Sequence, residues 1–210
     1  MSTHLDFTVM YAAHDAFRRD TDRLRDAAAA RAAHDPSVRN GWRTFKRQLA
    51  IHHTAEDTVL WPKLRAALVE NAGDTAILDA MEREHRDLET LLTAVDEALR
   101  DGDHAALTIH AEDLANTLDD HLEREEELAL PLIQSMLTEQ DWAAFDKAAR
   151  RLQGRRGVGV FLPWLLDGTP LSEQRRLLSL LPARLRVGYR AFWRPRYAAQ
   201  RLWAFPVPHH

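Results

Sequence analysis

Two segments of eleven residues decide the fold: HHTAEDTVLWP at His52–Pro62 and HLEREEELALP at His121–Pro131. They align at a constant offset of 69 residues (52 to 121), so that histidine falls on histidine, glutamate on glutamate and proline on proline. Further upstream, His14 and His85 are related by an offset of 71 residues (14 to 85), and a loop of different length explains the difference. The pattern indicates a duplicated helical hairpin.

Apolar residues recur every three or four positions in four stretches, a period that predicts amphipathic helices. The expected helices cover about residues 5–33, 37–70, 74–101 and 103–132. Asp74 is the expected N-cap of the third helix, and Pro62 is expected to kink or interrupt the second. The apolar stripes include Val9 and Leu128. Because short loops between long helices favour antiparallel neighbours, we expect an all-α fold, an up-down-up-down four-helix bundle.

Polar side chains interrupt the apolar stripe of each expected helix. In the second helix His52 follows Leu49 by three residues and Glu56 comes four residues later, and the fourth helix repeats this arrangement. The spacings between the four helix histidines are 38, 33 and 36 residues, nearly constant, as expected when an antiparallel chain crosses one layer once per helix. The inward-facing set is His14, His52, Glu56, His85, His121 and Glu125.

Four histidines and two carboxylates in one buried layer indicate a metal site, since burying them unpaired costs free energy that a cation offsets. Imidazole suits iron, copper, zinc and nickel, and a carboxylate can bridge two ions through its two oxygens. Pairing by hairpin assigns His14 and His52 to one ion and His85 and His121 to another, with both glutamates spanning the pair. Tyr11, one turn before His14, is a candidate for contact with this set.

Over residues 5–136 this pattern resembles the hemerythrin-like (HHE) family, a cation-binding domain with the motif His…His-x-x-x-Glu…His…His-x-x-x-Glu. The resemblance implies a non-haem centre of two iron ions per chain, oxo- or hydroxo-bridged, inside a four-helix bundle. The ligands that it implies are His14, His52, Glu56, His85, His121 and Glu125.

The chain departs from the oxygen-carrying hemerythrins at two positions. Those proteins have a further histidine four residues before the third-helix ligand, where this chain has Met81. Their last acid is an aspartate five residues after its histidine, where this chain has Glu126 directly after Glu125. The resemblance therefore favours the bacterial branch associated with peroxide decomposition, nitric oxide reactions or iron and oxygen sensing over reversible oxygen transport.

Two other ligand sets compete with this interpretation. His53 with Asp57 is an alternative register in the second helix, and the repeat argues against it because Leu122 is the equivalent of His53. Ferritin-like sites use Glu-x-x-His on two helices. Glu82 has that spacing from the third-helix histidine, but Leu118 stands where a second copy needs its glutamate, so carboxylate-rich ligation is not expected.

The composition limits the available chemistry. The chain has 210 residues, 11 histidines and no cysteine, which excludes disulfides, cysteine zinc fingers, thiol catalysis and thiolate-held iron–sulfur clusters. The N-terminus lacks the pattern of an export signal. The longest apolar run, residues 158–166, contains Pro163 and is too short to span a bilayer. We expect a cytoplasmic protein without a transmembrane segment.

Charge divides the chain into two parts. Residues 1–140 carry 15 basic and 28 acidic side chains, a net charge of −13, whereas residues 141–210 carry 13 basic and 4 acidic side chains, a net charge of +9. A boundary near Thr138 separates the expected bundle, residues 1–137, from a basic, aromatic-rich extension, residues 138–210.

The extension is expected to be helical. Thr138–Asp141 resembles a capping box, two further helices are expected over about residues 171–181 and 183–202, and Pro195 interrupts the last. The apolar segment Phe161–Leu166 is expected to dock, so the extension packs on the bundle or on a partner. Contact with a protein or an anionic membrane through residues 141–210 is the alternative, and no nucleic-acid motif is present.

Two functions agree with these features. The first is a hemerythrin-like di-iron protein that reacts with peroxide, dioxygen or nitric oxide in oxidative or nitrosative stress defence, with catalase- or peroxidase-like activity. The second is an oxygen or iron sensor, or an iron-binding module, that signals through the C-terminal extension. The sequence discriminates weakly between them, because no acid outside the proposed ligand set has the placement of a catalytic group.

Overall fold

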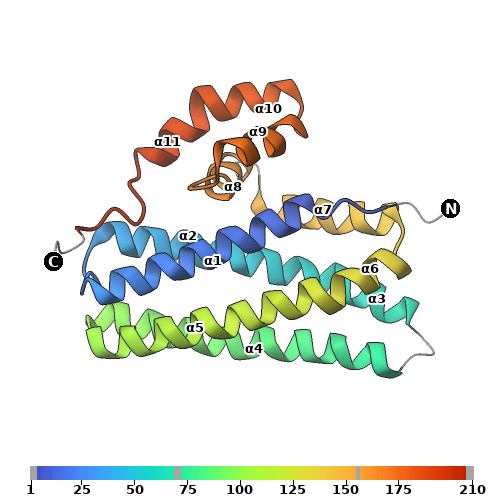
Figure 1. The fold of residues 1–210 in the computed structure, drawn as a ribbon, viewed down its shortest axis with the longest axis horizontal. Helices are drawn as coiled ribbons and strands as arrows, with labels where there is room; N and C mark the ends of the chain where they lie inside the picture. The colour runs from blue at the N-terminus through green and yellow to red at the C-terminus, as the bar shows by residue number, and fades with distance from the viewer. Residues whose placement is uncertain (1–3, 69–71, 155–156, 207–210) are drawn as a thin grey trace.

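Four long helices form the bundle in the structure, a computed structural model that describes residues 4–68, 72–154 and 157–206 (Figure 1). Both α1 and α4 contact α2 and α5, so the four helices close into a ring with an up-down-up-down course (Figure 1). The all-α bundle expected from the sequence is confirmed. The helices are α1 (Thr8–Ala29), α2 (Pro36–Ala55), α4 (Ala72–Asp101) and α5 (His104–Arg124).

Both α2 and α5 continue through a wide π-helical turn into a short helix. The four elements are η1 (Glu56–Leu60), α3 (Trp61–Ala67), η2 (Glu125–Ala129) and α6 (Leu130–Met136). Pro62 and Pro131 stand at the second position of the short helices, where a regular α-helix would bring the proline ring against the carbonyl four residues earlier. The wide turn relieves that clash, so the interruption expected at Pro62 is a π turn.

The π turn also changes which residues face the core. Leu128, expected on the apolar stripe, is 44% exposed, and Ala129 is buried instead. The wide turn contains one more residue than an α-turn, which shifts the inward face by one position. Near the start of α1, Val9 is 46% exposed and Met10 takes the buried position, one turn before the buried His14. Both Val9 and Leu128 were thus wrongly expected in the core.

Side-chain capping marks the starts of α2, α5 and α7. The side chains of Asp35 and Asp103 accept hydrogen bonds from the first backbone N–H groups of α2 and α5. Thr138 and Asp141 form the capping box expected at the start of the extension. Asp74 is not an N-cap, because α4 already begins at Ala72; the carboxylate lies in the first turn, where it still favours the positive end of the helix. The loop expected at residues 71–73 is shorter in the structure, because Ala72 and Gly73 already belong to α4, and residue 71 lies outside the described residues.

The extension forms a second layer on one side of the bundle (Figure 1). Within it, α7 lies along α2, α8 lies against α1, and the remaining elements pack around α8. A third π turn again precedes a proline, Pro195. The elements are α7 (Glu139–Gln153), α8 (Val158–Leu165), α9 (Leu171–Ser179), α10 (Ala183–Gly188), η3 (Tyr189–Trp193) and α11 (Arg194–Ala198).

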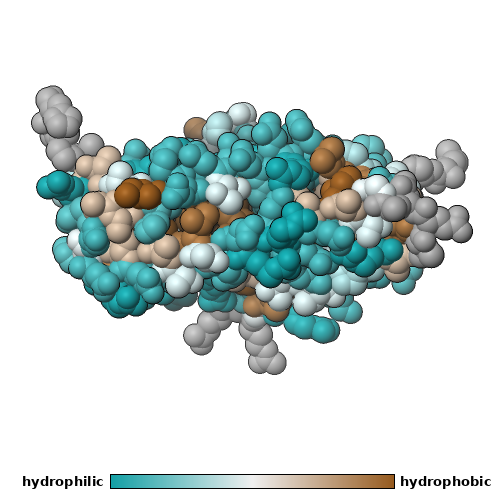
Figure 2. Space-filling view, turned by 90° about the horizontal axis from the view of Figure 1, so that it is seen from below, coloured by the Kyte–Doolittle hydropathy of each residue, from teal (hydrophilic) through white to brown (hydrophobic). Residues whose placement is uncertain are grey.

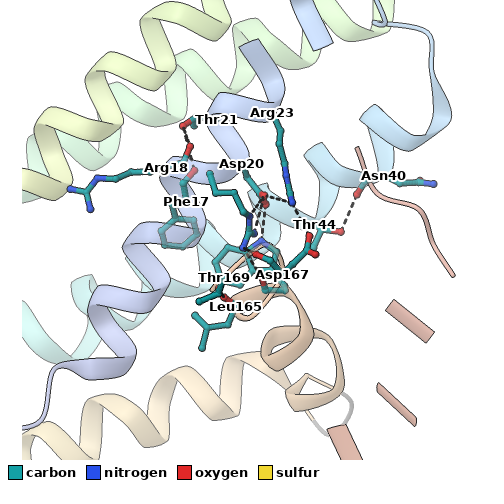
Figure 3. Close-up of polar contacts among 12 residues, drawn as sticks. Phe17, Arg18, Asp20, Thr21, Arg23, Asn40, Thr44, Leu165, Asp167 and Thr169 are labelled. Carbon is teal, nitrogen blue, oxygen red and sulfur yellow. Dashed lines mark hydrogen bonds and ion pairs between the residues drawn. The ribbon is translucent and has the colours of Figure 1, made fainter. Parts of the chain in front are cut away.

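A buried carboxylate joins the extension to α1. Asp20, 1% exposed, accepts a hydrogen bond of 2.8 Å from Trp164 Nε1 and ion pairs with Arg19 and Arg23. Arg23 also reaches Asp167, just after α8, at 2.8 Å (Figure 3). Burial raises the pKa of Asp20, although the guanidinium of Arg19 and the indole of Trp164 oppose the shift. The extension therefore shares a polar core with the first helix.

The opposite face of the bundle, which carries α4 and α5, is mostly hydrophilic (Figure 2). Among the described residues, no helix combines the length and the apolar character that crossing a membrane requires.

Candidate metal centre

The six sequence-predicted side chains meet at one level of the bundle, and every bundle helix contributes. All except His52 are buried, and His52 is 9% exposed at its side chain. Two groups of three residues each offer ligand atoms within 4.8 Å of one another. One group contains the expected pair from the first hairpin and the other contains the expected pair from the second. The groups are His14, His52 and Glu125, and His53, His85 and His121.

Glu56 lies between the two groups. Its Oε1 atom is 2.9 Å from His52 Nε2, and its Oε2 atom is 3.6 Å from His85 Nε2. Glu125 approaches the first group through Oε2, which is 3.4 Å from His14 Nε2. The two oxygens of Glu56 thus face histidines of different hairpins, as a carboxylate that bridges two ions must do.

Many of the nitrogen and oxygen atoms that could bind a metal in this cluster have no hydrogen-bond partner. Each of the five histidines has a buried Nε2 atom without a partner, and so do both oxygens of Glu56 and both oxygens of Glu125. Buried polar atoms are normally hydrogen-bonded, because an unpaired one costs free energy. Lone pairs of nitrogen and oxygen that converge without partners fit a metal ion, and this donor set suits iron, zinc or copper.

Three of the histidines are held through their other ring nitrogen. The Nδ1 atom lies 2.7 Å from Glu126 Oε1 in His14, 2.8 Å from Asp57 Oδ1 in His85, and 3.0 Å from Glu84 Oε2 in His121. A carboxylate on Nδ1 fixes the tautomer and turns Nε2 inward, as is usual for metal-binding histidines. Asp57 and Glu126 are equivalent in the repeat, so an acid directly after each glutamate was the signal in the sequence; Glu84 has no such signal.

Burial and the charges of neighbouring side chains shift the pKa values of the histidines and glutamates in the cluster. Burial opposes charge on His14, but Glu125 and Glu126 outweigh it and raise the pKa of His14 to about 9. Burial and the charge of His14 lower the pKa of His52 to about 3. Burial and the neighbouring Glu125 raise the pKa of Glu56, whereas His14 overcomes burial and lowers the pKa of Glu125 to about 2. Protons thus partly neutralise the site, and cations would replace them.

His53, which the repeat argument set aside, lies inside the second group. It is 5% exposed, and its ring stacks on His85 with centroids 3.8 Å apart and planes at 11°. The lone pair of an imidazole nitrogen lies in the ring plane, and one ion cannot lie in two parallel stacked planes. His53 therefore offers a third nitrogen to this group only after its ring tilts. The equivalent position in the other hairpin is Leu122, so the repeat could not predict this placement.

The two halves also differ beside His52. Glu84, which holds His121, directly precedes His85, and the residue that directly precedes His14 is Ala13. Ala13 has no acceptor side chain, and among the described residues His52 Nδ1 has no hydrogen-bond partner. One small residue thus removes from the first half a contact that the second half has.

Two other sequence-based expectations can be placed. Tyr11 does not touch the cluster: its side chain is 43% exposed and borders a surface groove with Leu5 and Pro131, because it lies on the opposite side of α1 from the buried Met10 and Ala13. Glu82, the acid of the ferritin-like spacing, pairs with Arg65 at 2.9 Å near the surface. As expected, Glu82 takes no part in the cluster.

Comparison with known families agrees with this geometry. Residues 5–133 match the model of the hemerythrin HHE cation-binding domain, which covers more than half of the chain. The chain belongs to the hemerythrin HHE cation-binding family. No curated protein and no solved structure gave a significant match. The HHE match contains both groups of histidines and ends inside α6, so the extension lies outside the matched part. Cation binding is accordingly the function that the family assigns to the bundle.

Proposed function

We propose that this HHE-family protein holds two iron ions and reacts with peroxide, dioxygen or nitric oxide. His14 and His52 would bind the first ion, His85 and His121 the second, and Glu56 and Glu125 would span both. After tilting out of its stack, His53 would add a third nitrogen to the second ion. The observation that supports the proposal best is the set of nine buried nitrogen and oxygen atoms without hydrogen-bond partners.

Bound iron would supply a redox-active Lewis acid, and the chain's own residues would prepare the site. Glu126, Asp57 and Glu84 hold the rings of His14, His85 and His121 through Nδ1, so that these rings need no reorientation on binding. Apolar side chains exclude water around the site: Phe17 packs edge-on against His52, with centroids 5.2 Å apart. With three nitrogens on the His85–His121 side and two on the other, the His14–His52 side would have more room for a small molecule.

Metal analysis, the optical spectrum and oxygen release from peroxide test the proposal together. The wild type is expected to bind two irons per chain, to absorb in the near-ultraviolet and to release oxygen from hydrogen peroxide. His52→Ala is expected to lose the metal and the activity. His110→Ala, a histidine of α5 outside the cluster, is the matched control. Wild type that binds no iron, or His52→Ala that releases oxygen as fast as wild type, would contradict the proposal.

A sensor is the second candidate, because one contact chain joins the site to the extension. The ring of Phe17 lies 5.2 Å from that of His52 and 5.1 Å from that of Trp164 in α8. In this role, metal occupancy alters how the extension docks. Limited proteolysis with and without iron tests it, and identical cleavage of residues 138–206 in both states argues for the enzymatic role alone.

A further inference from the structure

A cavity of about 210 Å³ lies between the bundle and the extension, and His52 forms part of its wall. Ala13 and Phe17 line it from the bundle, and Phe145 of α7 and Phe161 of α8 line it from the extension. The lining is mainly apolar, with Asp6, Asp146 and Arg150 as its charged members, so the cavity favours an occupant that is largely apolar. Because two of its walls belong to the extension, the bundle alone would leave this side of His52 open to water.

Two buried glutamines belong to the polar part of the cavity lining. Gln48 of α2 is 2% exposed and Gln153 of α7 is 7% exposed, and both line the cavity. Gln153 Nε2 donates a hydrogen bond of 2.5 Å to Gln48 Oε1, which leaves Gln48 Nε2 and Gln153 Oε1 without partners. Turning both amides exchanges these roles, and one donor and one acceptor still remain unpaired. Both atoms are buried, so an occupant reaches them only when the amides turn toward the cavity, and one that accepts one hydrogen bond and donates another would then satisfy both.

His52 borders this cavity because the first hairpin has the small Ala13 where the second hairpin has Glu84. In the second half, the carboxylate of Glu84 contacts Nδ1 of His121, whereas in the first half Ala13 leaves Nδ1 of His52 without a partner among the described residues. Ala13 and His52 both line the cavity. The occupant would therefore lie against a proposed metal-binding histidine from the side that carries no carboxylate.

We propose that this cavity binds a neutral organic molecule about the size of a substituted benzene ring that carries one hydroxyl or hydroperoxyl group. An apolar cavity of about 150 Å³ already holds benzene, so this larger cavity has room for a ring with a small substituent. The hydroxyl end pairs with the two glutamines, and the apolar body contacts the aromatic walls. The assignment rests on the proposed function, since it names the class of ligand that reaches the His52 side of the iron centre.

Calorimetric titration of the full chain with 2-phenyl-2-propanol tests the assignment, with cumene as the analogue that lacks the hydroxyl. The alcohol is expected to bind at least about fivefold more tightly than cumene, the factor expected for one added hydrogen bond. Cumene hydroperoxide, added to metal-free protein, is expected to displace the alcohol. Displacement supports the shared head group, whereas failure to displace restricts the ligand to alcohols. Equal binding of alcohol and cumene would overturn the role of the glutamines.

Substitutions on α7 locate the site. Ala149 lines the cavity, and Ala149→Phe is expected to weaken alcohol binding by at least about tenfold by filling it. Ala143→Phe, the same change at an exposed position of the same helix, is expected to leave binding unchanged. The double variant Gln48→Leu/Gln153→Leu is expected to bind cumene and the alcohol alike. Wild-type affinity in Ala149→Phe would overturn the assignment.

Metal analysis of the same samples separates this assignment from the proposed function. Alcohol binding by protein that takes up no iron would contradict the iron centre and leave the cavity assignment standing. Two bound irons without alcohol binding would contradict the cavity assignment alone.

Discussion

The first hairpin, from α1 to α3, and the second, from α4 to α6, have the same frame. Each has an inward histidine on its first helix, a His-x-x-x-Glu pair that ends in a π turn, and a proline two residues beyond that turn. Each also sends one acid, Asp57 or Glu126, across to a histidine of the other hairpin. The hairpins differ in what surrounds this frame: the second has Glu84 and Leu122 where the first has Ala13 and His53.

The comparison distinguishes two kinds of position in the duplicated bundle: those that face the cluster and those beside them. Positions that face the centre of the layer are equivalent in both hairpins, because both must present donors to the same point. Positions one residue away are free to diverge, and their divergence gives one half an extra carboxylate and the other half a cavity. The extension packs on the first hairpin, so the docking interface and the cavity both belong to that half.

The largest effect is expected where the hairpins are equivalent. Glu56→Ala and Glu125→Ala are each expected to abolish binding of both ions, because each carboxylate would span the pair. With metal present at about a thousandfold above its Kd, the lost stabilisation is about 4 kcal/mol for each ion and about 8 kcal/mol for both. For a chain of this length that corresponds to a Tm lower by about 16–32 °C. Melting curves and metal content with and without chelator measure this, with the exposed Glu123→Ala as control. Unequal metal content in the two variants would break the equivalence.

Glu84→Ala gives the second hairpin the residue of the first. Loss of the carboxylate on His121 Nδ1 is expected to lower metal affinity by about 10- to 100-fold, as for other outer partners of metal-binding histidines. Competition titration against a chelator measures the change. Glu89→Ala, an exposed glutamate of the same helix, is the control. An unchanged affinity would mean that Glu84 serves only its ion pair with Arg124.

His53→Leu gives the first hairpin the residue of the second. If the ring tilts to donate a third nitrogen, the variant is expected to bind one ion about tenfold more weakly and the other normally, within the range for lost metal contacts. Stepwise metal titration resolves the two affinities, and His110→Leu is the control. Two unchanged affinities would assign His53 a purely stacking role against His85.

Asp20→Leu tests the contact between the first hairpin and the extension. The variant gives the first hairpin the residue of the second, because Leu91 of α4 is the repeat equivalent of Asp20. The variant leaves Trp164 Nε1 without its acceptor and separates Arg19 and Arg23 from their buried partner, so a loss of about 1–3 kcal/mol of unfolding free energy is expected. Asp20→Asn keeps an acceptor and is expected to lose less. Urea unfolding measures both, and a leucine variant as stable as wild type would remove this contact from the docking interface.

The smallest effect concerns pH at the start of the extension. Hydrogen bonds from Lys63 and Thr138 lower the pKa of Asp141 from 3.8 to about 2. Because the folded pKa lies below the unfolded one, this stabilisation is present above about pH 4 and is lost as the pH falls towards 2. Asp141→Asn is expected to reduce the stability difference between pH 6 and pH 3 by less than about 1 kcal/mol, since the carboxylate is partly exposed and solvent screens its contacts. An identical pH dependence in both proteins would contradict this.

The repeat carried most of what the sequence could predict. It indicated the bundle and the six side chains that meet in it, because both depend on helical period and on equivalence between the hairpins. It misplaced Leu128, because a π turn shifts the register by one residue; three prolines, each six residues after the start of such a turn, were the available signal. The repeat could not predict the roles of His53 and Glu84 or the presence of the cavity, because the two hairpins have different residues at these places. The contact expected between Tyr11 and the cluster was wrong for a simpler reason: Met10, one residue earlier, takes the buried position on α1.

The order of the chain gives the cavity wall a further consequence. All seven side chains of the proposed centre precede Thr138, and the helices that close the cavity follow it. During synthesis the N-terminal part of a protein leaves the ribosome first and begins to fold first. The bundle can therefore fold while the His52 side still faces solvent, and cations that bind at that stage would enter before α7 and α8 cover that side.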